Sequence, residues 1–178
     1  MEKLGYILDR RSIRRFKDQN IDRDTVKQLV TAAMYAPSAV NRQPWHFVVI
    51  DQRQMLNKIM GIHPHAGMLQ TASHGIVVCG DEQLQHDDGY WVVDCGAATQ
   101  NLLLAAHTLG LGACWVGLHP REGRKASISS LLNLPSHVKP FALVALGYPK
   151  EIKPRPERFH SGKVRHNSWE QPYFQDKR

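Results

Sequence analysis

The sequence predicts an α+β fold in which helices flank a mixed central β-sheet. Three observations lead to this class. The chain has 178 residues, which is enough for one domain with a sizeable core. Short apolar runs typical of buried strands intermix with helical periodicities, without the strict alternation of a βαβ fold. No internal repeat is present, which excludes a solenoid.

The chain begins with two predicted helices. A short helix covers about residues 4–9, and a longer one covers about residues 22–35. In the longer segment apolar side chains recur at i, i+3, i+4 and i+7, and Asp22 or Asp24 supplies the N-cap. This helix is expected to end before Pro37, because helical backbone is disfavoured ahead of a proline.

Apolar runs bounded by turn residues predict four buried strands. These strands lie at residues 45–51, 75–80, 111–118 and 141–147. Two short helices are predicted between strands, at residues 54–60 and 122–132.

Residues 89–109 form the most regular predicted helix. Apolar side chains repeat along one face with spacing 4-3-4-3-4, at Trp91, Cys95, Ala98, Leu102, Ala105 and Leu109. Gly110 and Gly112 follow and end the helix. Such a helix is expected to be central to the core or to form a subunit interface.

The composition changes after Gly147. We predict that residues 1–147 form a single domain and that residues 148–178 form an extended basic arm with four prolines. The arm also carries four aromatic side chains, at Phe159, Trp169, Tyr173 and Phe174. A disordered tail rarely has so many, so we expect the arm to pack on its own body or on a second subunit.

The net charge of +7 comes entirely from the two ends of the chain. Residues 21–147 carry nine Lys/Arg and nine Asp/Glu, which cancel. The neutral middle argues against nucleic-acid binding. Two basic ends predict a focused anion site if the fold brings them together.

Cysteine usage and hydropathy indicate a cytoplasmic protein that does not enter the membrane. Cys79, Cys95 and Cys114 lie inside apolar runs and are expected to be reduced core residues. The longest apolar stretch, residues 102–118, is interrupted by His107 and three glycines, which argues against a membrane span. No signal peptide is expected at the start.

Residues 10–16 could bind a phosphate. In an extended chain Arg10, Ser12 and Arg14 share one face, and Ile13 can anchor the other. A solvated charge run is an equally good interpretation of these residues alone.

Two later segments could contribute to the same site. The loop at residues 36–45 offers polar side chains between stiff prolines, as suits a flat heterocycle, although a structural turn would look the same. Residues 147–158 present Lys153, Arg155 and Arg158 on a proline-stiffened chain, for which a solvated linker is the default interpretation.

No catalytic side chain and no metal site are predicted. The histidines are scattered, and no motif for a metal site or an activated nucleophile is present. Residues 110–117 contain GLGACWVG, in which Trp115 occupies the last glycine position of a dinucleotide-binding motif. The absence of acid–base motifs favours chemistry carried by a cofactor.

Taken in order, these segments resemble the nitroreductase family of flavoproteins. The shared motifs span nearly the whole chain, at residues 10–16, 36–45, 94–101, 110–117 and 146–149. They read RRSIRRF, APSAVNRQPW, DCGAATQN, GLGACWVG and LGYP.

The resemblance implies an intertwined α+β homodimer with two FMN sites at the subunit interface. It places near the FMN phosphate and ribityl chain Arg10, Arg11, Ser12, Arg14, Lys153, Arg155 and Arg158. It places against the isoalloxazine, from the other subunit, Pro37, Ser38, Ala39, Asn41 and Gln43. The backbone beside flavin N5 corresponds to Trp115, Val116 and Gly117.

The resemblance also implies an activity. In a ping-pong cycle NAD(P)H delivers hydride to N5 of tightly bound FMN, and an electron-poor small molecule then takes it up: a nitroaromatic, a quinone or an activated alkene. The alternatives are a flavoenzyme of the same fold with a different task (dehydrogenase, dehalogenase or flavin-fragmenting enzyme) and a non-catalytic flavin-binding protein. Larger members carry a lysine near the pyrimidine edge of the flavin. Residues 63–68 here lack one, so no residue is assigned to that edge.

Overall fold

The computed structural model describes residues 2–174 of the chain. The helices are α1 (Gly5–Leu8), α2 (Arg23–Met34), α3 (Arg53–Ile62), α4 (Tyr90–Thr108) and α5 (Glu122–Leu131). The strands are β1 (Trp45–Ile50), β2 (His74–Asp81), β3 (Gly112–Gly117), β4 (Val138–Gly147), β5 (Arg165–His166) and β6 (Ser168–Pro172). Short 3-10 turns lie at η1 (Glu2–Leu4), η2 (Ala39–Asn41), η3 (Gly67–Gln70) and η4 (Ser161–Lys163).

Every element predicted within residues 1–147 is present. The largest difference is at β4, which begins at Val138, ahead of the predicted start at residue 141. Of the two candidate N-caps of α2, Asp22 is the one used, because its carboxylate accepts the backbone N–H of Thr25 at 2.7 Å. The β5–β6 hairpin was not predicted.

The four long strands form one sheet with the order β1-β2-β4-β3. All three pairs of neighbouring strands are antiparallel. Among the described residues, the parallel component of the predicted mixed sheet is limited to an isolated bridge between Ser12 and Ala113. The predicted α+β class is confirmed.

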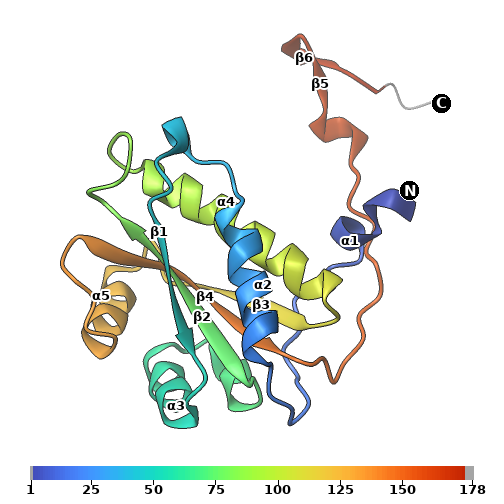
Figure 1. Cartoon of the computed structure of the whole chain (residues 1–178). Coiled ribbons are helices and arrows are strands. Elements are labelled where there is room, and N and C mark those ends of the chain that lie inside the picture. Colours follow the sequence, from blue (N-terminus) through green and yellow to red (C-terminus); the bar gives the residue numbers. More distant parts are fainter. Residues whose placement is uncertain (1, 175–178) are drawn as a thin grey trace.

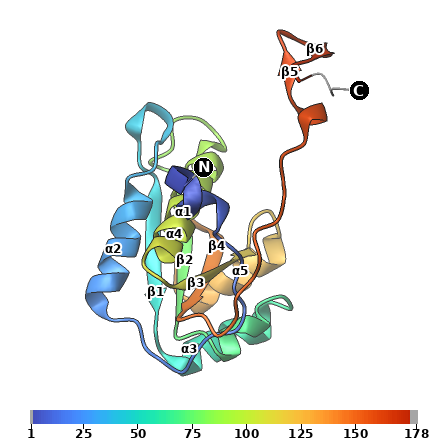
Figure 2. The same cartoon turned by 90° about the vertical axis from the view of Figure 1, so that its right-hand side faces the viewer.

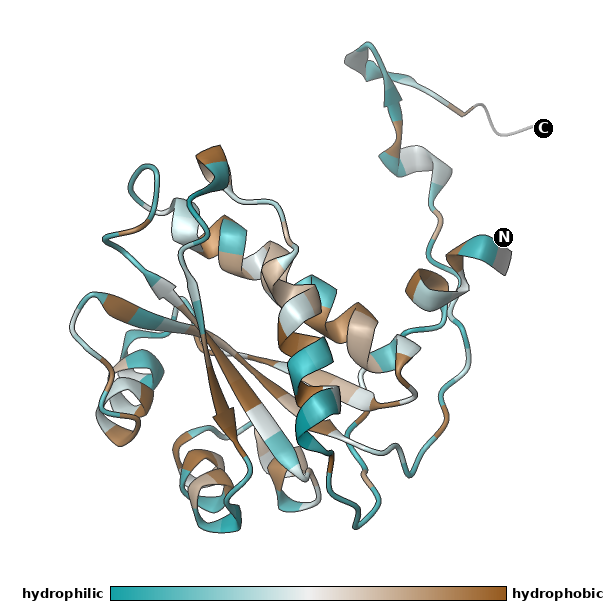
Figure 3. Ribbon diagram, in the orientation of Figure 1, coloured by the Kyte–Doolittle hydropathy of each residue, from teal (hydrophilic) through white to brown (hydrophobic). Residues whose placement is uncertain are grey.

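Helices cover both faces of the sheet (Figure 1). α2 and α4 lie on one face, and α3 and α5 lie on the other. Along β2, Ile76 and Val78 pack toward α2 and α4, whereas Val77 and Cys79 pack toward α3 and α5. Every residue of β2 is buried, as expected for a strand covered on both faces. The brown colour of the central strands in Figure 3 shows the same apolar character.

The predicted seam of α4 is buried only in its first part. Trp91, Cys95, Ala98 and Leu102 are buried, but Leu109 is 37% exposed. Near the end of the helix the buried positions shift to residues 103 and 106. The shift follows from geometry, because an α-helix has 3.6 residues per turn and drifts by about 20° per heptad from a 3.5-residue repeat.

The C-terminal segment leaves the body of the molecule (Figures 1 and 2). It runs past α1 and ends in the β5–β6 hairpin, away from the sheet. Its large aromatic side chains are exposed, at 64% for Phe159, 78% for Trp169 and 59% for Tyr173. Arg165 lies over the Trp169 ring, 5.3 Å from its centroid.

The cysteines occupy the expected positions. Cys79, Cys95 and Cys114 are free and buried, and burial raises the pKa of the Cys79 thiol to about 12. Within residues 2–174, none of the helices has the length and apolar character needed to cross a bilayer.

Candidate functional site

The fold brings the two basic ends of the chain together at the β3 edge of the sheet (Figure 2). The N-terminal segment joins the edge through the bridge between Ser12 and Ala113. The segment at residues 148–155 then runs beside it, and the backbone N–H of Lys150 donates to the carbonyl of Arg15 at 2.9 Å. The condition for a focused anion site is therefore met.

Two glycines allow the N-terminal segment to approach the sheet so closely. A Cβ on Gly112 would lie 2.7 Å from Cγ2 of Ile13, and a Cβ on Gly147 would lie 2.9 Å from the Phe16 ring. Ile13 and Phe16 are buried, so they anchor the segment and fix which side chains turn outward. The predicted anchoring role of Ile13 is confirmed.

A carboxylate holds the two ends to each other. Glu151 Oε1 accepts the backbone N–H of Arg14 at 2.6 Å, and Lys153 Nζ donates to the carbonyl of Ser12 at 2.7 Å. Lys153 also lies 3.3 Å from Glu151. The Arg14 N–H and then Lys153 lower the pKa of the Glu151 carboxyl, because both stabilise its charged form.

Two of the predicted phosphate ligands are also held by protein groups. Arg11 donates from Nε to the carbonyl of Pro154 at 2.9 Å and from Nη2 to the carbonyl of Leu8 at 2.6 Å. Arg155 forms a two-nitrogen contact with Asp9, at 2.6 Å for each nitrogen. Together with Lys153, these side chains fasten the basic segments to each other.

Three of the predicted guanidinium ligands stay available. Among the described residues, Arg10, Arg14 and Arg158 form no ion pair with a carboxylate. Burial, followed by repulsion from Arg158 and Arg11, lowers the pKa of Arg10. Arg10 and Arg158 line a pocket of about 610 Å³. The lining also includes Glu157, but four guanidinium groups outnumber it. Excess positive charge beside a pocket of this size suits a phosphate.

A second pocket, of about 600 Å³, opens along the end of β3. Trp115 is 37% exposed there, and its ring packs edge-on against Phe141 at 5.6 Å. The residues that line this pocket are Arg14, His63, His65, Gly67, Met68, Cys114, Trp115, Val116, Gly117 and Arg124. The structure thus joins the predicted segment at residues 115–117 to Arg14 in one cavity, which is large enough for a planar ring system.

The loop at residues 37–43 adopts a constrained backbone. Val40, Asn41 and Gln43 have φ values of 50°, 56° and 50°, which is unusual for residues other than glycine and most unusual for β-branched Val40. The backbone N–H of Gln43 donates to Ser38 Oγ at 2.9 Å, and Gln43 Nε2 donates to Asn41 Oδ1 at 2.8 Å. Part of the predicted ligand set therefore braces the loop itself.

Asp94 of α4 holds this loop in place. Its Oδ1 accepts the backbone N–H of Ala39 at 3.0 Å, and its Oδ2 is buried without a hydrogen-bond partner. Within residues 2–174, no hydrogen bond or ion pair joins the loop to the arginine segments. The structure of one chain therefore does not bring this part of the predicted site to the rest.

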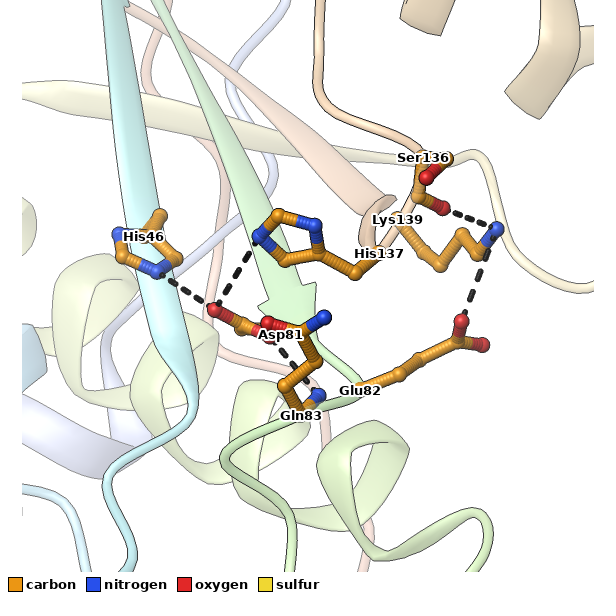
Figure 4. Close-up of polar contacts among 7 residues, drawn as sticks. All are labelled: His46, Asp81, Glu82, Gln83, Ser136, His137 and Lys139. Atoms are coloured by element: carbon orange, nitrogen blue, oxygen red, sulfur yellow. Dashed lines mark hydrogen bonds and ion pairs between the residues drawn. The ribbon is translucent and has the colours of Figure 1, made fainter.

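A separate polar cluster lies at the C-terminal end of β2 (Figure 4). Asp81 Oδ2 lies 3.5 Å from His46 Nε2 and 3.8 Å from His137 Nε2, and Asp81 Oδ1 accepts the backbone N–H of Gln83. No group of three His, Cys, Asp or Glu side chains in the described part of the chain is arranged to hold a metal ion.

The sequence-based analysis missed several residues of these sites, and four of them show why. Glu151 and Asp94 had a signal: an acid inside a basic segment and an acid inside an apolar helix. His63 and Arg124 had none, because only the tertiary structure places them beside Gly117.

Comparisons with known proteins give a consistent result. The sequence profile described as "Nitroreductase family" matches residues 7–66 and 63–148. A protein of Methanothermobacter thermautotrophicus, provisionally named NADH dehydrogenase/NAD(P)H nitroreductase, is 43% identical over 95% of this chain and 88% of its own length.

Comparison with solved structures points to the same family. A crystal structure from Parabacteroides distasonis with the same provisional name matches with a TM-score of 0.90 and 36% identity, over 95% of this chain and 99% of that one. A nitroreductase-like protein of Desulfovibrio desulfuricans, crystallised in complex with FMN, matches with a TM-score of 0.79 and 28% identity, over 93% and 96% of the two chains.

Proposed function

Since this chain belongs to the nitroreductase family, we propose that it is an FMN-dependent oxidoreductase that passes hydride from NAD(P)H to an electron-poor small molecule. The observation that carries the proposal is a pair of cavities: one is flanked by the unpaired guanidinium groups of Arg10 and Arg158, and the other is bounded by residues 115–117. Their chemistry matches the two ends of FMN, a phosphate and a planar ring.

The arginine segments would hold the phosphate. Arg10, Arg14 and Arg158 are free to make charge-assisted hydrogen bonds to it, and Ser12 lies between the first two. Three other basic residues act indirectly, because their side chains hold together the segments that carry the binding residues: Arg11, Lys153 and Arg155. The pKa of Arg10, lowered in part by its cationic neighbours, supports this assignment, since an anion would relieve that repulsion.

The second cavity would hold the ring. Trp115, Val116 and Gly117 line it, so their backbone can border the flavin. When bound, FMN supplies the redox chemistry, accepting hydride from NAD(P)H and passing it to a nitroaromatic, quinone or activated alkene in ping-pong order. The cavity's own part is to align the reactants within about 3–3.5 Å of each other and to exclude competing geometries.

We further propose a homodimer in which residues 1–147 form the domain and residues 148–178 form an arm that embraces the partner. The exposed aromatic side chains of the arm support this, because an apolar surface of that kind needs a covering partner. In the dimer, Pro37, Ser38, Ala39, Asn41 and Gln43 would reach the flavin bound to the other subunit. The free, buried cysteines are consistent with action in the reducing cytoplasm.

The first experiment is to measure FMN uptake. We expect the purified protein to be yellow or to bind added FMN, and the double variant Arg10→Ala/Arg14→Ala to lose it. Arg15→Ala is the matched control, because Arg15 is exposed and its side chain makes no hydrogen bond or ion pair among residues 2–174. Wild-type retention by the double variant would show that the phosphate is wrongly placed.

The second experiment separates an enzyme from a flavin carrier. We expect oxidation of NADH or NADPH that depends on an added acceptor, with menadione and a nitrofuran as test compounds. A protein that binds FMN but reduces neither compound would favour the carrier, or a flavoenzyme of the same fold with another task.

A further inference from the structure

The ring cavity is lined by basic side chains and by no carboxylate. Its lining includes two guanidinium groups, Arg14 and Arg124, and two imidazoles, His63 and His65, but none of its ten lining residues is Asp or Glu. Arg124 comes from α5, an element that carries no residue of the predicted site. It is half-buried, and it forms no ion pair within residues 2–174.

His63 determines what Arg124 can do. His63 is 2% exposed, and its Nδ1 faces the backbone N–H of His65 at 3.1 Å, so Nδ1 must be the acceptor. Its Nε2 faces the carbonyl of Gly117 at 2.9 Å, so Nε2 must carry the proton. In the opposite tautomer, the proton on Nδ1 would face the N–H of His65, and the lone pair on Nε2 would face the carbonyl of Gly117.

His63 therefore offers no hydrogen-bond acceptor to Arg124. Its Nη1 lies 3.3 Å from Nε2 of His63, but that nitrogen already donates to Gly117. A guanidinium has only donors, and a half-buried one without an acceptor is costly. The N–H groups of Arg124 are thus offered to whatever occupies the cavity.

We propose that Arg124, beside His63, binds a planar oxyanion, or an oxygen-rich edge that becomes anionic, in this cavity. The inference rests on the proposed function, because it assumes that the flavin ring occupies the cavity. A planar fork of donors matches such an edge better than a lysine does. Two sources share the chemistry: the pyrimidine edge of reduced FMN and a carboxylate or nitro group on the acceptor.

The reaction itself creates the need for such a group. Hydride transfer to neutral FMN releases NAD(P)+ and adds one negative charge to the flavin. Transfer onward, with a proton from water, removes that charge and restores oxidised FMN. A fixed cation at the ring edge favours the charged state in a site of low dielectric constant.

The test uses FMN-loaded protein and three variants. Arg124→Gln removes the charge, and Arg124→Lys keeps the charge but not the fork. Arg121→Gln is the matched control, since it removes an exposed arginine at the start of the same helix without touching the cavity. FMN stoichiometry is measured first, followed by the reduction potential by dye equilibration.

If the flavin is the source, Arg124→Gln should weaken binding of reduced relative to oxidised FMN by about tenfold. That change lowers the two-electron potential by about 30 mV. If the acceptor is the source, the KM for 4-nitrobenzoate should rise about tenfold, while that for neutral 4-nitrobenzamide should not. The reduction potential and the KM of Arg124→Lys should lie between those of wild type and Arg124→Gln. If Arg124→Gln does not fold, Arg124→Lys alone tests the proposal.

The outcomes separate the two proposals. A shift in either readout that Arg121→Gln does not share supports the role of Arg124 and identifies the source. Wild-type values of both readouts in the FMN-loaded Arg124 variants overturn the inference and leave the proposed function intact. A wild-type protein that takes up no FMN overturns both.

Discussion

Substitution of Gly112 by alanine tests whether the close approach of the N-terminal segment builds the anion site. The new Cβ would lie 2.7 Å from Cγ2 and 2.9 Å from Cβ of Ile13. Carbon atoms in contact prefer about 3.5–4.0 Å, so the segment must retreat by roughly 1 Å. Ile13 Cβ is next to the backbone and cannot rotate away. Overpacking of this kind costs about 1–3 kcal/mol of stability.

The same retreat should weaken FMN binding. A shift of roughly 1 Å takes Arg10 and Arg14 outside the range of about 2.7–3.2 Å that hydrogen bonds require. Loss of one charge-assisted bond, about 1.5–3 kcal/mol, corresponds to a Kd that rises roughly 10- to 100-fold. Quenching of FMN fluorescence on titration measures the Kd, and thermal unfolding measures the stability.

Gly61→Ala is the control, because a Cβ there meets nothing within 4 Å. Since Gly61 lies inside α3, that substitution should leave FMN binding unchanged and stabilise the protein slightly. Should Gly112→Ala bind FMN as tightly as wild type, the segment does not depend on this contact for its position, and the reasoning fails.

Four further predictions concern single side chains and the C-terminal arm. The pKa of Glu151 is lowered in the folded protein, so its contribution to stability is present at neutral pH and is lost as the pH falls through that lowered value. The pH at which FMN is released on acidification should therefore shift in Glu151→Gln, and an unchanged pH dependence would refute the role of Glu151 in holding the two ends together. Asp22→Ala should cost about 1 kcal/mol by chemical denaturation, because it removes the N-cap of α2, and no loss would show that the cap is not needed. Val40→Gly should raise Tm, because a strained non-glycine φ costs about 1–3 kcal/mol, and a lower Tm would contradict that strain. Removal of residues 165–178 should shift the sedimentation coefficient from dimer toward monomer, and an unchanged dimer would exclude the embracing arm.

The fold could be predicted because each element has a local signal. Apolar runs predicted the four buried strands, and an i, i+3, i+4 pattern predicted α2. The arm was harder, since its hairpin at residues 165–172 has exposed side chains and so no apolar alternation. The strained loop was beyond prediction, because a valine at φ 50° contradicts the local preference of that residue.

The anion-binding part of the candidate site could be predicted from charge. Nine basic and nine acidic residues cancel in the middle of the chain, which singled out the arginines at the ends, and the structure brings those ends together. The sequence could not show which basic side chains are free, because that depends on which carboxylates and backbone carbonyls lie beside them in the folded chain. Asp9 engages Arg155, and Glu151 engages Lys153, although each acid lies among basic neighbours in the sequence.

This division of the basic residues has an energetic consequence. The paired residues Arg11, Lys153 and Arg155 fasten the two ends whether or not a ligand is present, whereas Arg10 and Arg158 repel each other until an anion arrives. A ligand that binds only the folded state stabilises it by RT ln(1 + [L]/Kd), about 2.7 kcal/mol at a hundredfold excess over Kd. Phosphate binding should therefore stabilise the basic ends more than the sheet, because the relieved repulsion lies between them. Protection of residues 10–16 and 150–158 from hydrogen exchange should rise on FMN addition while that of β2 stays constant, and uniform protection would place the repulsion elsewhere.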